Sequence, residues 1–215
     1  DEKSNLTTID ALIQRKQPFA VYRVPGEKYP RLLTEDVGAV RLIFDLKELN
    51  GQRGFVIAPF RPNETCPILL IQSNGPGQPL LLADDADAVP RDIPSTDYPS
   101  CSEEYAECFR TFISALRDKT FEKLVLSRKL TIGKPSAFSP SLAFRAACQR
   151  YIHSYIYLCY TPQTGIWLGS TPEIILSGEK DDWNTVALAG TQPLQDGKLP
   201  QVWDEKNRKE QEYVS

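Results

Sequence analysis

The sequence predicts an α+β fold with mainly antiparallel sheets flanked by helices. Short apolar runs bounded by turn residues recur along the chain, which is typical of strands. The connections between most of these runs are too short for the crossovers that a parallel sheet needs. Apolar residues at helical spacing occupy a few separate segments, so helices alternate with groups of strands.

The expected strands are rich in β-branched and aromatic residues. They lie at residues 19–24, 39–44, 54–60, 67–72, 121–132, 154–160, 165–169, 173–176 and 183–189. Asn50-Gly51 is a turn signal between two of them. Residues 73–78 contain Asn-Gly-Pro-Gly and are expected to form a loop.

Helices are expected at about residues 7–13, 103–116, 139–150 and from 201 to the end of the chain. Ser100 and Glu103 have the spacing of a capping box. Ser139 followed by Pro140 matches an N-cap with proline at the first helical position. Residues 84–100 are rich in Asp and Pro, so we expect a surface linker that divides the chain into residues 1–99 and 100–215.

Composition limits the function classes. The 215 residues carry a net charge of −3, with 41% hydrophobic and 10% aromatic residues, which predicts a globular domain rather than a disordered chain. Mild acidity argues against a nucleic-acid partner, which requires a broad cationic face. It does not exclude an anionic small molecule, because a local pocket can oppose the global charge.

The cysteines and the single His153 point to no metal cage. The chain has five cysteines at irregular spacing and no C-x-x-C pair, so a zinc or thioredoxin-type site is not indicated. Free thiols are expected in a reducing compartment. No apolar run approaches the ~20 residues of a membrane span, and no signal peptide opens the sequence. We therefore expect a cytoplasmic protein with no membrane partner.

Lys123 lies among apolar residues of an expected strand, where burying an ammonium group is costly. It is either a solvent-facing lysine of an alternating strand or a desolvated amine usable as a general base. Glu173 follows the turn Gly-Ser-Thr-Pro and precedes an apolar strand. It is either an ordinary turn residue or a general acid at the mouth of a sheet.

Gly190 and Thr191 end another expected strand, where backbone N–H groups suit a carboxylate ligand. The last helix carries Glu205, Glu210 and Glu212 among basic residues. Such a run is typical of a solvated, salt-bridged face. Alternatively, one carboxylate binds Mg²⁺, which prefers one or two carboxylates with water and an anionic ligand.

Four segments in this order resemble the motifs of chorismate-utilising enzymes. Residues 121–128 (FEKLVLSR) resemble their K-V-V-L-S-R strand, and residues 169–176 (GSTPEIIL) are similar to their G-x-S-P-E-x-L turn. Residues 187–191 (ALAGT) resemble L-A-G-T, and residues 205–214 (EKNRKEQEYV) resemble E-K-x-R-x-E-H-x-x-V. The resemblance covers residues 100–215 and implies the fold of that family.

Lys123 together with Ala189 resembles the branch of the family that adds water. That branch contains isochorismate synthases and the related salicylate synthases. The implied reaction converts chorismate to isochorismate in menaquinone or siderophore biosynthesis. The alternatives are a salicylate synthase, which also eliminates pyruvate, a non-catalytic module that keeps the fold, and a generic α+β domain.

The resemblance also implies a role for each candidate residue. Lys123 is the general base that activates water for attack at C2, and Glu173 is the general acid that protonates the departing C4 hydroxyl. Glu210 is a ligand of the cofactor Mg²⁺, which holds the ring carboxylate of chorismate. Gly190 and Thr191 contact that carboxylate.

The sequence departs from the family pattern at two places. Gln211 replaces the usual His, and Gln192-Pro193 stand where many relatives have an Arg. Relatives continue past the last helix with a second Mg²⁺ carboxylate and further substrate contacts. We therefore expect residues 100–215 to be the first part of the catalytic region, truncated at the C-terminus, and the 215-residue chain alone to be inactive.

Overall fold

The computed structural model describes residues 3–34, 40–81, 103–129, 131–134, 136 and 138–215. These residues belong to two compact units. The first unit comprises Asp1–Ala88 and Ser139–Ser215, and the second comprises Val89–Phe138. Each unit is described by itself.

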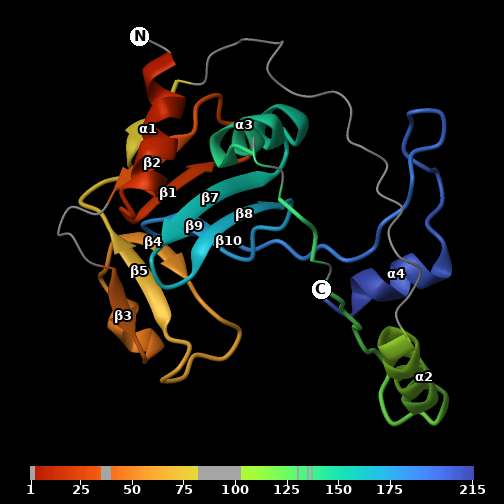
Figure 1. The fold of residues 1–215 in the computed structure, drawn as a ribbon. Helices are drawn as coiled ribbons and strands as arrows, with labels where there is room; N and C mark the ends of the chain where they lie inside the picture. Colours follow the sequence, from red (N-terminus) through yellow and green to blue (C-terminus); the bar gives the residue numbers. More distant parts are fainter. Residues whose placement is uncertain (1–2, 35–39, 82–102, 130, 135, 137) are drawn as a thin grey trace. The chain divides into compact units, whose positions relative to one another are not determined.

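A five-stranded antiparallel sheet organises the first unit, with strand order β6-β2-β1-β7-β8 (Figure 1). Its strands are β1 (Phe19–Arg23), β2 (Arg31–Thr34), β6 (Gln78–Pro79), β7 (Tyr155–Thr161) and β8 (Gly165–Thr171). Since β1 and β7 pair with each other at the centre, the sheet joins segments that lie far apart in the sequence.

The central strand β1 is buried on both faces, and its alternation separates two cores. Phe19 and Val21 pack in one cluster with helix residues, whereas Ala20 packs in another with Leu69 and Ile71. Successive side chains of a strand point to opposite faces, so these clusters lie on the two sides of the sheet. The apolar runs of the sequence therefore reflect burial on both faces.

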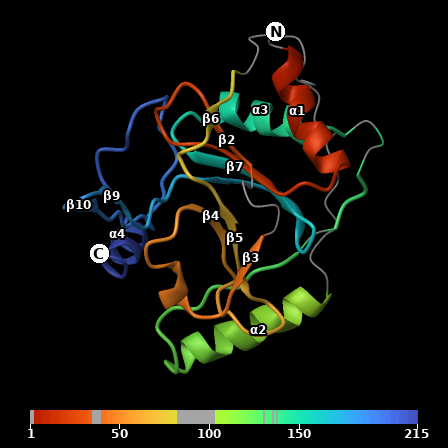
Figure 2. The same cartoon turned by 90° about the vertical axis from the view of Figure 1, so that its left-hand side faces the viewer.

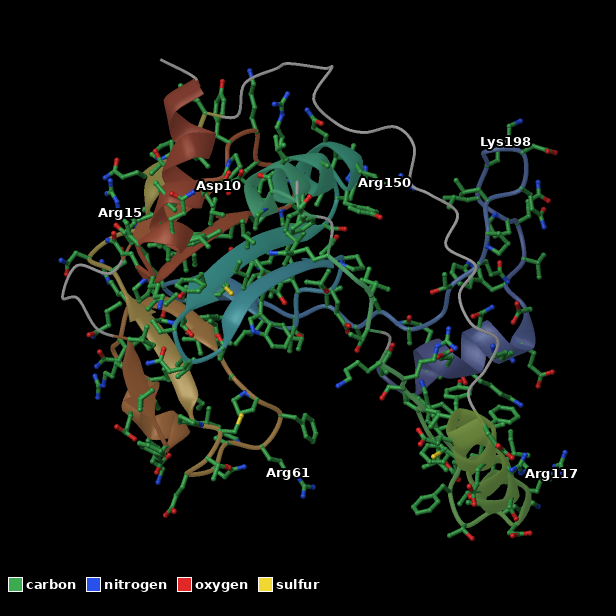
Figure 3. The ribbon with its side chains drawn as sticks, in the orientation of Figure 1. Asp10, Arg15, Arg61, Arg117, Arg150 and Lys198 are labelled. Atoms are coloured by element: carbon green, nitrogen blue, oxygen red, sulfur yellow. The ribbon has the colours of Figure 1, made fainter. Side chains whose placement is uncertain are left out.

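Helices α1 (Lys3–Gln14) and α3 (Pro140–Arg150) cover one face of this sheet (Figure 2). Asp10 of α1 binds them together, because its Oδ2 accepts hydrogen bonds from the Ser141 hydroxyl (2.8 Å) and the Ser139 hydroxyl (3.3 Å) (Figure 3). At the other end of α3, the buried Arg23 guanidinium donates to the carbonyls of Cys148 and Tyr151, each at 2.5 Å. This cation satisfies carbonyls that the end of a helix leaves without partners.

A three-stranded antiparallel sheet covers the other face, with strand order β3-β5-β4. It consists of β3 (Arg41–Ile43), β4 (Gly54–Ile57) and β5 (Ile68–Gln72), with the short 3-10 helix η1 (Leu46–Leu49) after β3. The first unit thus has a helix layer, a five-stranded sheet and a three-stranded sheet stacked in this order (Figure 2).

The first unit continues after β8 with a small hairpin and a short helix. β9 (Ser177–Glu179) pairs antiparallel with β10 (Asp182–Asn184), and α4 (Glu205–Glu212) follows. Asp204 caps α4 by accepting the N–H of Asn207 at 2.8 Å. The second unit contains α2 (Glu103–Arg117). Within this unit, the guanidinium of Arg128, which follows α2 in the chain, lies 6.0 Å from the ring centroid of Tyr105 in the helix.

The α+β prediction with antiparallel sheets is confirmed. β1, β5 and β7 lie within one residue of their expected ranges, and α3 begins after Ser139 as the N-cap signal indicates. The structure adds β2, β6 and β9, which the sequence interpretation missed, and β6 begins within the expected loop. Helix α1 begins at Lys3, earlier than expected, and the expected cap at Ser100 lies outside the described residues.

Three predictions of strands near the candidate residues are wrong or too long. The described residues of 121–132 form no strand, residues 173–176 form none, and residues 183–189 contain only the end of β10. A strand requires hydrogen bonds to a neighbouring strand as well as an apolar pattern. Among the described residues, the structure shows no such ladder for residues 121–132 and 173–176, and in 183–189 only Trp183 and Asn184 pair with β9.

The first unit combines β1, β2 and β6 with β7 and β8, so residues 1–99 and 100–215 share one sheet. The predicted boundary between those two parts lies outside the described residues and stays a prediction. None of the helices in the described part of the chain has both the length and the apolar composition that a membrane span requires.

Candidate functional site

One face of α4 is protected from solvent, and Glu210 lies on it. Asn207, Glu210 and Gln211 are half-buried, whereas the other residues of the helix are exposed. Residues three and four positions apart share a helix face, which explains this pattern. Of the three glutamates of this segment, Glu205 is exposed and paired with Lys209 (2.8 Å), and Glu212 is exposed. Of the three glutamates, Glu210 is therefore the one on the sheltered face.

The protected face of α4 contacts the segment 187–192 through side-chain amides. Oε1 of Gln211 accepts the backbone N–H of Ala189 at 3.1 Å, and Nε2 of Gln211 donates to the carbonyl of Ala187 at 2.8 Å. One turn earlier, Oδ1 of Asn207 accepts the N–H of Thr191 at 3.0 Å. These bonds hold the expected substrate-binding segment against the helix that carries Glu210.

Asp204 closes the same contact at the start of α4. Its carboxylate accepts hydrogen bonds from the backbone N–H of Asn207 (2.8 Å), the side-chain amide of Asn207 (2.7 Å) and the amide of Gln192 (3.1 Å). Hydrogen bonds from Asn207, reinforced by the Gln192 amide, stabilise the charged form and lower the pKa of Asp204 from its usual value. Asp204 therefore orients the same Asn207 that holds Thr191.

Gly190 and Thr191 are placed differently from the sequence-based expectation of open backbone donors. The N–H of Thr191 is already bonded to Asn207, and the Thr191 hydroxyl lies 3.4 Å from the carbonyl oxygen of Ala189, to which it donates. Gly190 is half-buried against α4, where its backbone approaches the carbonyl of Asn207. The backbone N–H of Thr191 therefore serves the contact with α4.

A pocket of about 440 Å³ lies beside this contact, with Gln192, Pro193, Trp203 and Asp204 in its lining. The chain between Thr191 and α4 forms it, and Lys198 marks the far end of that loop (Figure 3). Oε1 of Gln192 is buried and has no hydrogen-bond partner among the described residues. A buried carbonyl oxygen without a partner carries a free-energy cost that a donor from a ligand or water would relieve.

Glu173 lies just after β8, which includes Gly169–Thr171 of the expected turn, and the strand expected to follow Glu173 does not form. The N–H of Glu173 donates to the Thr171 hydroxyl at 3.2 Å, which closes the turn. Its carboxylate is exposed in the first unit. The structure thus gives Glu173 a defined backbone position next to the edge strand β8.

Lys123 belongs to the second unit, in the irregular segment after α2. Its side chain is exposed within that unit. The first unit brings Gly190 and Thr191 together with the face of α4 that carries Glu210. The roles of Lys123, Glu173, Gly190, Thr191 and Glu210 stay predictions.

Glu210 offers one carboxylate to a magnesium ion, and the binding of Mg²⁺ here stays a prediction. Among the described residues no group of three or more His, Cys, Asp or Glu side chains gathers as a metal cage. Mg²⁺ takes one or two carboxylates and completes its shell with water and ligand oxygens. Among the candidate residues, Glu210 is the half-buried carboxylate that would contribute to such a shell.

Asn207 and Gln211 are the residues whose contribution the sequence interpretation missed. Gln211 stood out only as a departure from the family pattern. Their spacing of four residues, together with Glu210 between them, was the available signal, because it predicts one shared helix face.

Comparison with known proteins identifies the family. The family model described as chorismate binding enzyme matches residues 83–215, more than half of the chain. The protein belongs to this family, which implies an enzyme with chorismate as its small-molecule substrate. The searches of curated proteins and of solved structures returned no match. The predicted resemblance is therefore confirmed at the level of the family.

Proposed function

We propose that the protein is an isochorismate synthase that adds water at C2 of chorismate and removes the C4 hydroxyl with the aid of Mg²⁺. The observation that supports this most is local. The half-buried Glu210 shares its helix face with Asn207 and Gln211, which hold the L-A-G-T segment. This arrangement joins a carboxylate suited to Mg²⁺ with a segment suited to a substrate carboxylate.

The proposed reaction is an isomerisation, because one water adds at C2 and one water leaves from C4. Lys123 accepts a proton from the water whose oxygen bonds to C2. Glu173 donates a proton to the C4 hydroxyl, which leaves as water while the double bond shifts. Water is a weak nucleophile and hydroxide a poor leaving group, so the reaction needs both a base and an acid.

The proposal makes one requirement of the protonation of Lys123 and another of the charge around the substrate. A lysine amine accepts a proton only in its neutral form, and exclusion of water favours that form. Lys123 is exposed within its unit, so the proposal requires the bound substrate to shield it. Chorismate carries two carboxylates, and Mg²⁺ bound through Glu210 supplies positive charge to a chain of net charge −3.

The reaction is tested with the protein expressed from its complete gene, supplied with chorismate and MgCl₂, and the products are identified by chromatography and mass spectrometry. We expect isochorismate. Lys123→Ala is expected to lower kcat by at least ~100-fold, because general base catalysis typically contributes that much. Lys129→Ala, which removes an exposed lysine of the same segment, is the matched control and is expected to retain activity.

Other products point to the alternatives. Salicylate with pyruvate identifies a salicylate synthase, and Mg²⁺-dependent chorismate binding without turnover identifies a non-catalytic module. Unchanged turnover in Lys123→Ala contradicts the assignment of the base. Full activity of the 215-residue chain by itself contradicts the expectation that it is inactive alone.

The proposed setting is menaquinone or siderophore biosynthesis in the cytoplasm.

A further inference from the structure

The contact between α4 and residues 187–192 is a matched ladder of side-chain and backbone groups. The two segments run antiparallel, because Thr191 pairs with Asn207 and Ala189 pairs with Gln211. Four residues of an α-helix rise about 6 Å, and two residues of an extended chain rise about 6.6 Å. Amide side chains four positions apart therefore reach backbone groups two positions apart.

Gln211 makes a two-point contact that few side chains reproduce. Its carboxamide accepts from the Ala189 N–H and donates to the Ala187 carbonyl at the same time, as a neighbouring strand does. The N–H of Ala189 and the carbonyl of Ala187 belong to residues two apart, which point to the same side of an extended backbone. The N–H of the intervening Gly190 takes part in none of these bonds with α4.

We propose that Asn207 and Gln211 are positioning residues that fix the orientation of the Gly190–Thr191 backbone. By occupying the N–H groups of Ala189 and Thr191, they direct the N–H of Gly190 away from α4 as the donor for a ligand carboxylate. Glu210 shares the helix face with both amides, so the same ladder sets the spacing between Glu210 and Gly190. This inference rests on the proposed function for the identity of the ligand, whereas the ladder itself rests on the hydrogen bonds alone.

Amide hydrogen exchange measured by NMR on the same protein as the product assay tests the ladder directly. In the unchanged protein the amides of Ala189 and Thr191 are expected to be protected without ligand. Chorismate with MgCl₂ is expected to slow exchange of the Gly190 amide. Gln211→Met keeps the length of the side chain but removes both hydrogen bonds. It is expected to speed exchange of Ala189 about tenfold and to weaken chorismate binding by a similar factor.

Two further variants separate positioning from general damage. Gln211→Glu keeps an acceptor for the Ala189 N–H, so exchange of Ala189 is expected to be slower than in Gln211→Met. Glu212→Gln changes the exposed neighbour and is expected to leave exchange and binding unchanged. The amide of Leu158 in the buried strand β7 serves as the internal reference for folding.

Each outcome decides one part of the inference. Unchanged exchange of Ala189 in Gln211→Met contradicts the ladder, and faster exchange with unchanged chorismate affinity contradicts the positioning role. A Gly190 amide that is insensitive to chorismate, in a protein that binds chorismate, contradicts the assignment of the donor. Failure of the unchanged protein to bind chorismate overturns the ligand part together with the proposed function, while exchange of Ala189 and Thr191 still decides the ladder.

Discussion

The backbone of Gly190 lies directly against the carbonyl oxygen of Asn207 in the first turns of α4. A Cβ atom added at Gly190 would lie 2.6 Å from that oxygen and 3.4 Å from a ring carbon of Trp203. The nearest atom belongs to the helix backbone, so it cannot move aside as a flexible side chain can. The close approach gives a physical reason for glycine in the L-A-G-T segment.

Replacement of this glycine is expected to separate the segment from α4. Gly190→Ala forces the two backbones apart and breaks the hydrogen bonds of Asn207 and Gln211, at a cost of about 1–3 kcal/mol. Local opening of α4 is then more frequent, and trypsin is expected to cleave after Lys206 and Arg208 at least ~5-fold faster. The measurement is limited proteolysis followed by mass spectrometry.

The matched control is Gly75→Ala, because a Cβ there meets nothing within 4 Å. Its cleavage after Lys206 is expected to equal that of the unchanged protein. Equal cleavage rates for Gly190→Ala and Gly75→Ala contradict the close contact between Gly190 and the helix.

Gly169 is expected to be required for stability because the ring of Tyr157 lies over it. The two residues are directly opposite in β8 and β7, and a Cβ at Gly169 would lie 2.3 Å from a carbon of that ring. The ring cannot swing away freely, since its centroid packs 6.1 Å from that of Phe55 and 6.4 Å from that of Tyr155. Gly169→Ala is expected to lower the free energy of unfolding by about 1–3 kcal/mol in urea titrations.

Ser170→Ala provides the comparison for Gly169→Ala, because it introduces the same residue at an exposed position of β8. It is expected to change the free energy of unfolding by less than about 0.5 kcal/mol. A stability for Gly169→Ala equal to that of Ser170→Ala shows that the aromatic packing yields without cost.

The thiols are expected to differ sharply in reactivity. Burial raises the pKa of Cys148 to about 11 and that of Cys159 to about 12, whereas Cys66 and Cys108 are exposed. Because the thiolate is the reactive form, iodoacetamide at pH 8 is expected to label Cys66 and Cys108 and to spare the buried pair. Mass spectrometry of peptides reads the result, and labelling in urea is the control. Labelling of Cys159 in the folded protein at the rate of Cys66 contradicts its burial.

The elements predicted correctly from the sequence are those whose signals are local. Ser139 and Pro140 fix the start of α3 through their own side chains, since Ser139 accepts the N–H of Leu142. β1 and β7 are recognisable because both faces are buried, which requires continuous apolar runs. β2, by contrast, has only four residues, and pairing with β1 rather than its composition makes it a strand.

Local sequence patterns did not predict the contacts between segments that lie far apart in the chain. The pattern of residues 121–132 predicts an extended conformation, but a strand forms only where another strand supplies partners. The candidate residues were recognisable as types of side chain in ordered motifs. The bond between Gln211 and Ala189 joins residues 22 positions apart and depends on how α4 packs, so no local pattern reveals it.

The contact between α4 and Thr191 is expected to weaken in acid. Hydrogen bonds from Asn207 and Gln192 lower the pKa of Asp204 below its usual value of 3.8. A carboxyl group whose pKa is lower in the folded state stabilises that state above the unfolded pKa and loses this effect as pH falls through the folded pKa. Exchange of the Thr191 amide, corrected for its intrinsic pH dependence, is therefore expected to quicken below pH 3.8. Asp204→Asn is expected to remove this response, whereas Glu212→Gln on the exposed side of α4 is expected to keep it. A Thr191 response that persists in Asp204→Asn contradicts the role of this carboxylate.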